Sequence, residues 1–266
     1  MFTLYAVDGK EIIVNPGNFP DHTLNIKLPD KDIHTILWKY ENDAELFTLI
    51  CIRGHYASCD IRLLLPYIPH ARMDRVKNPD DVFTLKYFCQ TINSMHFNEV
   101  VVLDAHSNVS LALLDRVFQE PIDLPLIEVF NSLDCNNLLL FYPDEGAMKR
   151  YSGCFNMPYA FGMKKRNWET GQIEGLDLIN GELVKNHNVL IIDDICSRGG
   201  TFLHSAHALK AAGAEDIYLY VTHAENTMVY GEMYNDPELV THIFTTNSLF
   251  NKENDVLNKV TIIENW

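Results

Sequence analysis

Two adjacent carboxylates followed by a pair of glycines are the most informative chemical feature of this sequence. Asp193 and Asp194 follow the aliphatic run 189–192, which is typical of a strand covered on both faces in a parallel sheet. Ligands bind such sheets beyond the carboxyl ends of their strands. The carboxylates can accept hydrogen bonds from neighbouring sugar hydroxyls, and Gly199 and Gly200 let backbone N–H groups approach a phosphate. The pattern therefore predicts a ribose-phosphate site.

A helix after the glycines would complete this site. We expect the helix to start at Thr201, whose hydroxyl can cap the first backbone amides, and to end at Gly213. The positive end of a helix favours an anion. The predicted ribose-phosphate ligands are Asp193, Asp194, Ser197, Arg198, Gly199, Gly200 and Thr201.

A second charged segment follows another aliphatic run. Residues 63–65 are typical of a strand, and Arg72, Asp74 and Arg75 come shortly after it. Each arginine offers a planar, permanently charged guanidinium group that suits a nucleotide polyphosphate. Asp74 could hold one guanidinium group or accept a hydrogen bond from adenine or ribose. A solvated charged turn is the alternative interpretation.

Four further polar or charged residues stand out by their positions in the sequence. His106 and Asp144 each follow an aliphatic strand, and Lys164 and Arg166 belong to a run of three cations in an acidic chain. Basic groups can neutralise the charge on a phosphoryl group in transfer. An exposed charged turn is the alternative for the cations.

Two motifs resemble those of known families. Residues 189–201 resemble the phosphoribosyl-diphosphate binding motif of type I phosphoribosyltransferases and their relatives. Residues 63–75 contain Pro66-Tyr67, three variable residues and then Ala-Arg-x-Asp-Arg. This pattern is similar to the signature of ribose-phosphate diphosphokinases, the phosphoribosyl-diphosphate synthetases, and ordinary phosphoribosyltransferases lack it. The resemblance extends from about residue 45 to residue 250.

The resemblance implies an enzyme that transfers a diphosphate group from ATP to the C1 hydroxyl of ribose 5-phosphate and releases AMP, with Mg2+ as cofactor. It also implies a homo-oligomer, a dimer or larger. Lys164 and Arg166 match the family's catalytic lysine and arginine, and residues 167–175 would form a flexible flap. The implied ATP ligands are Arg72, Asp74, Arg75 and His106, and the implied metal ligands are His106 and Asp144. Mg2+ prefers oxygen ligands and keeps several waters, so His106 is better suited to contact it through water.

Two segments depart from the family's pattern. Residues 19–23 lack the glycine and glutamate of the family's adenine-binding segment, so the mode of adenine recognition stays open. Ser197 and Arg198 stand where the family usually has aspartate and threonine, which raises the charge of the loop by about two units. Such a loop could hold ribose 5-phosphate more strongly. It could equally accept a more anionic molecule such as ADP-ribose, as compact phage-encoded relatives do in rebuilding NAD.

Two other functions are weaker alternatives. A non-catalytic regulator associated with the synthetases would keep the fold and lose active-site residues. The presence of Arg72, His106, Lys164 and Arg166 argues against it. A plain phosphoribosyltransferase is disfavoured by the arginine motif.

Composition restricts the partners and the compartment. The chain has 21 lysines and arginines against 36 aspartates and glutamates, and the resulting net charge of -15 argues against nucleic acid. No apolar run is long enough to span a bilayer, and the first ten residues lack the features of a signal peptide. The six cysteines show no Cys-x-x-Cys spacing, and most lie in apolar contexts, which are typical of reduced thiols. We expect small-molecule substrates, no membrane and a cytoplasmic location.

Strands alternate with helices along the chain, which predicts an α/β fold. In line with the resemblance, we expect two phosphoribosyltransferase-like domains, each a mostly parallel sheet flanked by helices. Residues 47–52 are typical of an early strand, and residues 82–97 of a helix. We assign ATP to a domain at 1–130 and the ribose phosphate to one at 131–266. The final strand, within 240–249, is expected to return to the first domain.

Overall fold

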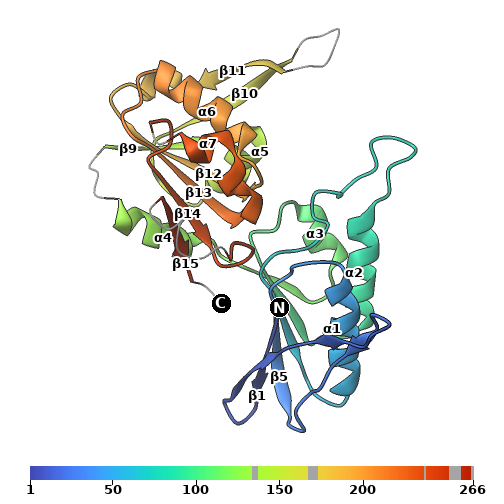
Figure 1. The fold of residues 1–266 in the computed structure, drawn as a ribbon. Coiled ribbons are helices and arrows are strands. Elements are labelled where there is room, and N and C mark those ends of the chain that lie inside the picture. Colours follow the sequence, from blue (N-terminus) through green and yellow to red (C-terminus); the bar gives the residue numbers. More distant parts are fainter. Residues whose placement is uncertain (134–136, 167–172, 237, 252–258, 265–266) are drawn as a thin grey trace. The chain divides into compact units, whose positions relative to one another are not determined.

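The computed structural model describes residues 1–133, 137–166, 173–236, 238–251 and 259–264, with the backbone alone at 164–166 and 173–174. The chain forms two compact units, residues 1–121 and 122–265. Each unit has its own β-sheet with helices beside it, which confirms the predicted α/β fold (Figure 1). Helix α4 (Asp123–Ser132) lies in the second unit, whereas a boundary at 130 would assign most of it to the first.

The first unit contains a mixed six-stranded sheet. Its strand order is β2-β1-β5-β6-β7-β8. The four strands from β5 to β8 are parallel, and β1 pairs antiparallel with both of its neighbours. The strands are β1 (Phe2–Ala6), β2 (Glu11–Val14), β5 (Ile33–Trp38), β6 (Arg62–Leu65), β7 (Glu99–Leu103) and β8 (Val117–Glu120). A small hairpin, β3 (Gly17–Asn18) and β4 (Leu24–Asn25), is separate from this sheet.

Three helices accompany this sheet, and one of them corrects a prediction. They are α1 (Ala44–His55), α2 (Thr84–Ser94) and α3 (Asn108–Leu113). The prediction of a strand at 47–52 is wrong, because this segment lies within α1. Thr48, Leu49 and Ile52 are buried at helical spacing, while Phe47 is exposed. Helix α2 confirms the helix predicted at 82–97.

The second unit contains a seven-stranded sheet of order β11-β10-β9-β12-β13-β14-β15. All pairs are parallel except the β10–β11 hairpin. The expectation that the final strand returns to the first domain is wrong, because β14 pairs with β13 and β15 pairs with β14. The strands are β9 (Leu138–Tyr142), β10 (Tyr159–Arg166), β11 (Ile173–Ile179), β12 (Asn188–Cys196), β13 (Ile217–Ala224), β14 (His242–Thr246) and β15 (Val260–Ile263).

Both faces of the second sheet are covered. Alternate residues of β12 belong to different apolar clusters, with Val189 and Ile191 in one and Leu190 and Ile192 in the other. This alternation explains why the strand reads as a continuous aliphatic run. The other elements of the unit are α5 (Glu145–Tyr151), α6 (Gly200–Ala211), α7 (Glu232–Asn235), η1 (Gly181–Leu183) and η2 (Asn226–Tyr230). No helix in the described ranges is both long and apolar enough to cross a membrane.

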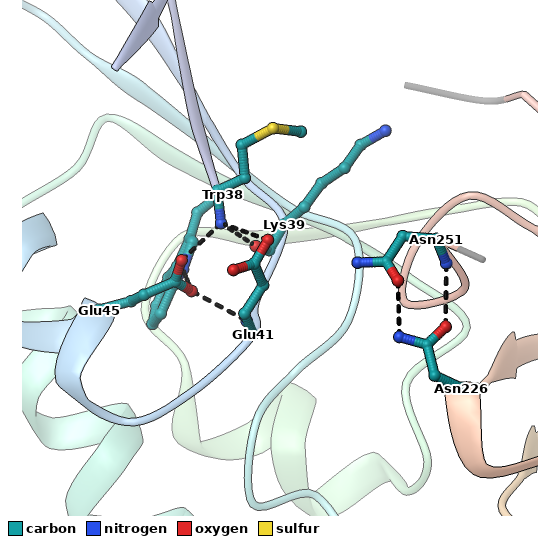
Figure 2. A network of polar contacts seen from close by, with 7 residues as sticks. Trp38, Lys39, Glu41, Glu45, Asn226 and Asn251 are labelled. Carbon is teal, nitrogen blue, oxygen red and sulfur yellow. Dashed lines mark hydrogen bonds and ion pairs between the residues drawn. The ribbon is translucent and has the colours of Figure 1, made fainter. Parts of the chain in front are cut away.

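A carboxylate joins β5 to α1 in the first unit. Glu45 Oε2 accepts a hydrogen bond from the indole Nε1 of Trp38 at 2.8 Å and another from the backbone N–H of Glu41 at 2.9 Å (Figure 2). The Trp38 side chain is fully buried in the core of this unit. The Glu45 carboxylate therefore satisfies a donor that water cannot reach.

Removal of this carboxylate tests its contribution to the first unit. We expect Glu45→Ala to lower the free energy of unfolding by about 1–3 kcal/mol, because a buried indole N–H would lose its acceptor. Urea unfolding followed by tryptophan fluorescence measures the change. Glu41→Ala is the matched control, since it keeps the Trp38 acceptor. Equal losses in the two variants would contradict the role given to Glu45.

Candidate functional site

Three carboxylates come together at one edge of the second sheet. Strands β9 and β12 pair in parallel, so the segments after both strands lie on the same side of the sheet. Asp144 follows β9, while Asp193 and Asp194 lie within β12, which continues to Cys196 rather than ending before the aspartates. The longer strand reflects continued pairing with β13.

The negative charges in this cluster affect one another. The pKa of Asp193 lies well above the ordinary range, first because burial disfavours its ionised form and then because of the charge of Asp194, with a smaller effect of Asp144. Asp193 therefore favours a proton, a cation or a hydroxyl donor beside it. Such a carboxyl suits the hydroxyls of a sugar, which donate hydrogen bonds.

An arginine that sequence reasoning missed faces these acids. Arg150 Nη1 lies 3.3 Å from Asp194 Oδ1, and the Asp194 side chain is buried. Arg150 sits in the last turn of α5, and its guanidinium also lies 5.4 Å from the centre of the Tyr151 ring. The only signal in the sequence was a cation on the helix that follows Asp144, which does not identify its partner in the neighbouring strand.

Asp144 has a structural task as well as its place in the cluster. Its Oδ1 accepts hydrogen bonds from the backbone N–H groups of Gly146 and Ala147, at 3.0 and 3.1 Å, and thereby caps α5. In the part of the chain that the structure describes, no three acidic, cysteine or histidine side chains are grouped as metal ligands. The acids of this edge fit a Mg2+ ion held largely by water and substrate phosphates, which is its usual mode in phosphoryl-transfer sites.

The predicted phosphate-binding loop, residues 197–199 and called the phosphate loop below, ends at a glycine with a left-handed backbone conformation. Gly199 has φ of 76° and is the N-cap of α6, which begins at Gly200. The expectation that Thr201 caps the helix is wrong, because Thr201 lies inside the first turn and the cap has no side-chain hydrogen bond. The glycine conformation lets the chain turn directly into the helix. The first amides of α6 thus point to the loop, where an anion would bind. Gly213 follows the end of α6 at φ of 94°, as predicted.

A second backbone segment packs directly against this loop. A Cβ atom on Gly231 would lie 2.0 Å from the Arg198 carbonyl oxygen, so no other residue fits there without movement of the loop. The buried Met233 side chain reaches within 3.0 Å of the position of a Cβ atom on Gly199. Sequence reasoning missed both residues. Gly231 stands between η2 and α7, and nothing in its local pattern indicates a contact with a loop more than thirty positions earlier.

The first unit brings three of its four predicted ATP ligands, Asp74, Arg75 and His106, close to one another. Strands β6 and β7 pair in parallel, and the segments after them hold Asp74 and His106. Asp74 is buried and accepts hydrogen bonds from Arg75, Nε at 2.7 Å and Nη2 at 3.1 Å. Arg75 lowers the pKa of Asp74, with smaller effects of Ser107 and His106. Asp74 therefore orients Arg75, which is one of the two roles predicted for it.

Two contacts support the segment that carries His106. The Leu103 N–H donates to the Pro66 carbonyl at 3.1 Å and links the His106 segment to residues 66–75, the loop that carries Arg72 and Arg75. The Ala105 N–H donates to Gln119 Oε1 on β8 at 3.1 Å. Asp104 is buried at φ of 41°. His106 therefore stands on a sharply turned backbone that the neighbouring strands hold in place.

The predicted catalytic pair lies on a strand of the second unit. Lys164 and Arg166 belong to β10, which pairs with β9 on one side and with β11 on the other. The register of β10 and β11 shifts between Lys165 and Arg166. The structure describes the backbone of this pair, and most of the predicted flap, residues 167–172, lies outside the described residues.

Comparison with known proteins relates this chain to one family of enzymes. The phosphoribosyl transferase domain model matches residues 155–253. The ribose-phosphate pyrophosphokinase of Bradyrhizobium diazoefficiens is 29% identical over 168 residues, which cover 61% of this chain and 52% of that protein. That of Mycoplasma genitalium is 29% identical over 225 residues, which cover 78% of this chain and 65% of that protein. The matches thus span between half and two thirds of these relatives.

A solved structure shows the same fold across both units. The crystal structure of phosphoribosylpyrophosphate synthetase from Mycobacterium smegmatis superposes with a TM-score of 0.77 at 18% sequence identity. The superposition covers 97% of this chain and 88% of that chain. The likeness in fold includes the first unit, which the domain model does not match.

Replacement of Asp193 by asparagine tests whether burial and the neighbouring acids raise the pKa of this carboxyl. The pKa of Asp193 is raised in the folded protein, so the folded state binds more protons than the unfolded chain and loses stability as the pH rises from about 4 through the raised pKa. Asp193→Asn lacks this loss. We expect its thermal midpoint to exceed that of the wild type at pH 8, by about 2–4 °C for each 1 kcal/mol gained. The two midpoints should converge towards pH 4.

Calorimetry between pH 4 and pH 8 measures this difference. Asp177→Asn, at an exposed position of β11, is the matched control and should follow the wild-type curve. A stabilisation by Asp193→Asn that stays constant across the pH range would show that burial and neighbouring charges do not raise the pKa of Asp193.

Proposed function

We propose that the chain is a member of the ribose-phosphate pyrophosphokinase family and that it transfers the diphosphate group of ATP to the C1 hydroxyl of ribose 5-phosphate. The C1 oxygen forms a bond with the β-phosphorus of ATP, the bond between that phosphorus and the α,β-bridging oxygen breaks, and AMP leaves. The hydroxyl proton is released. The observation that carries the proposal is the cluster of Asp193 and Asp194 next to the loop that turns at Gly199 into α6.

On the acceptor side, the sugar hydroxyls and the phosphate have separate partners. Asp193 and Asp194 accept hydrogen bonds from the ribose hydroxyls, and Arg150 holds Asp194 in orientation. The backbone of 197–201 and the start of α6 bind the 5-phosphate, to which Ser197 and Thr201 can add their hydroxyls. This division suits an acceptor that carries hydroxyls on one side and a dianion on the other.

On the nucleotide side, charge is the main contribution of the protein. Arg72 and Arg75 are exposed in the loop that follows β6, and the Asp74 carboxylate holds the Arg75 guanidinium by two hydrogen bonds. A guanidinium held in this way loses little freedom when it binds a polyphosphate. Lys164 and Arg166 would neutralise the charge that develops during transfer, since phosphoryl transfer depends on positioning and charge stabilisation.

A bound Mg2+ would neutralise the phosphate oxygens of ATP and polarise the phosphorus under attack. We propose His106 in the first unit and Asp144 in the second as residues that could each bind Mg2+, His106 through water. Asp144 Oδ1 already caps α5, so the Asp144 carboxylate is kept in one orientation by the helix it caps.

ADP-ribose is a second candidate acceptor. Arg198 is exposed in the loop, and Gly231 packs against the backbone of Arg198 rather than its side chain. A guanidinium there could contact a second phosphate beyond the one held by backbone amides. The chemistry at the C1 hydroxyl would be unchanged.

A product assay tests the reaction. With ATP, Mg2+ and ribose 5-phosphate we expect AMP and a sugar 1-diphosphate in equal amounts, and EDTA should abolish both. Phosphorus NMR and chromatography of the nucleotides identify the products. ADP as the sole nucleotide product would contradict the proposal, because it reports transfer of one phosphoryl group. Binding of ATP without any turnover would favour the regulator.

Arg198→Thr, which restores the family's usual residue, separates the two acceptors. If ADP-ribose is the acceptor, its kcat/KM should fall by the equivalent of about 1.5–3 kcal/mol, the range for hydrogen bonds to charged groups. The value for ribose 5-phosphate should change less, because amides at the helix terminus hold a single phosphate. Equal effects on the two acceptors would show that Arg198 does not discriminate between them.

A further inference from the structure

The segment η2–α7 packs against the phosphate loop. Contacts that fix the position of η2–α7 therefore also fix the position of the loop. Gly231 and Met233 of this segment contact the backbone of Arg198 and the space beside Gly199. The Glu225 N–H, just before η2, donates to the Cys196 carbonyl at 2.8 Å. These contacts are close and mostly backbone to backbone, so a displacement of α7 would displace the loop with it.

A lysine from the end of the chain holds α7 by its carbonyl groups. Lys259 Nζ donates hydrogen bonds to the backbone oxygens of Tyr234 at 2.8 Å, Asp236 at 2.9 Å and Met233 at 3.4 Å. The ammonium group also lies 5.7 Å from the centre of the Tyr234 ring. The last carbonyls of a helix have no intrahelical partner, and a cation there is favourable. Burial lowers the pKa of Lys259, which agrees with an ammonium group enclosed by these oxygens.

The lysine is itself attached to the sheet. Its carbonyl oxygen accepts a hydrogen bond from the Ile243 N–H of β14 at 2.8 Å, immediately before β15 begins. A second connection joins the start of η2 to the same end of the chain. Asn226 Nδ2 donates to Asn251 Oδ1 at 2.6 Å, and the Asn251 N–H donates to Asn226 Oδ1 at 3.1 Å (Figure 2). The segment η2–α7 is therefore fastened at both ends.

We propose that Lys259 is a positioning residue of the ribose-phosphate loop, because it fixes α7 and thereby the backbone of Arg198 and Gly199. The inference rests on the proposed function for the identity of the ligand. Binding of a phosphate by backbone amides needs several N–H groups in a fixed arrangement, and a small displacement loses much of their effect. Lys259 itself contacts three carbonyls of its own chain and is assigned no contact with the substrate.

The experiment compares Lys259→Met with the conservative Lys259→Arg and with Lys210→Met. Methionine keeps most of the lysine stem and removes the charge and the donors. Lys210 is the matched control, because it lies in the last turn of α6 and its Nζ also donates to a backbone carbonyl, that of Glu215, in the same unit. Lys210 therefore makes the same kind of contact as Lys259, but at the end of α6 that lies away from the phosphate loop.

The first readout is hydrogen exchange of backbone amides in the full chain without substrates. The Leu203 N–H donates to the Gly199 carbonyl at 2.8 Å and reports on the loop. We expect Lys259→Met to speed its exchange by about tenfold or more. Lys259→Arg should restore most of the protection, and Lys210→Met should leave it unchanged. Unchanged exchange at Leu203 in Lys259→Met, or an equal increase in Lys210→Met, would overturn the inference.

The second readout is steady-state kinetics with ATP and ribose 5-phosphate. Lys259→Met should raise the KM of the ribose phosphate by between about tenfold and a hundredfold and leave the KM of ATP within about twofold. A parallel rise in both constants would indicate general destabilisation and would overturn the inference. A wild-type protein that releases no AMP would refute the proposed function alone, since hydrogen exchange at Leu203 is measured without substrates.

Discussion

Parallel strand pairing is the constraint on which the candidate site depends. The segments that follow parallel strands lie at one edge of a sheet, so Asp144 after β9 and the loop after β12 become neighbours. Burial on both faces fixes this register, because a shift of one residue would exchange the side chains that face the two apolar clusters. The same rule in the first unit brings Asp74 and His106 close enough to affect one another.

The same strand register brings the carboxylates of Asp144, Asp193 and Asp194 close together, and among the described residues a positive charge lies beside only one of the two aspartates of β12. Arg150 lies beside Asp194, whereas the pKa of Asp193 stays high because burial and two neighbouring acids oppose its ionisation. Such an arrangement lowers the stability of the empty protein and favours a ligand that brings hydroxyl donors or a cation. Residues that bind are commonly not those that stabilise. In the first unit the pKa of Asp74 is lowered rather than raised, because Arg75 stabilises the ionised carboxylate. The same hydrogen bonds orient the Arg75 guanidinium.

The loop that would bind phosphate is shaped by residues that never need to touch a ligand. Gly231 admits the Arg198 carbonyl, Met233 fills the space beside Gly199, and Lys259 holds the carbonyl end of α7. The final strands β14 and β15 belong to this unit rather than to the first, and this membership is what makes Lys259 available to α7. The pairing of β14 with β15 therefore contributes, through Lys259, to the shape of the loop that we propose to bind the ribose phosphate.

Local pattern by itself determined the aliphatic strands, the glycine turn and the two motifs. A strand covered on both faces, such as β12, reads as a continuous aliphatic run, and glycine admits the positive φ that the turn at Gly199 adopts. Local pattern could not separate a strand from a helix at 47–52, since a short apolar run suits either, and packing of Leu49 and Ile52 against the sheet decided for α1. The tertiary structure alone decided the partners of Arg150, Gly231 and Lys259. Their contacts join segments far apart in sequence, and only the folded register of the strands brings those segments together.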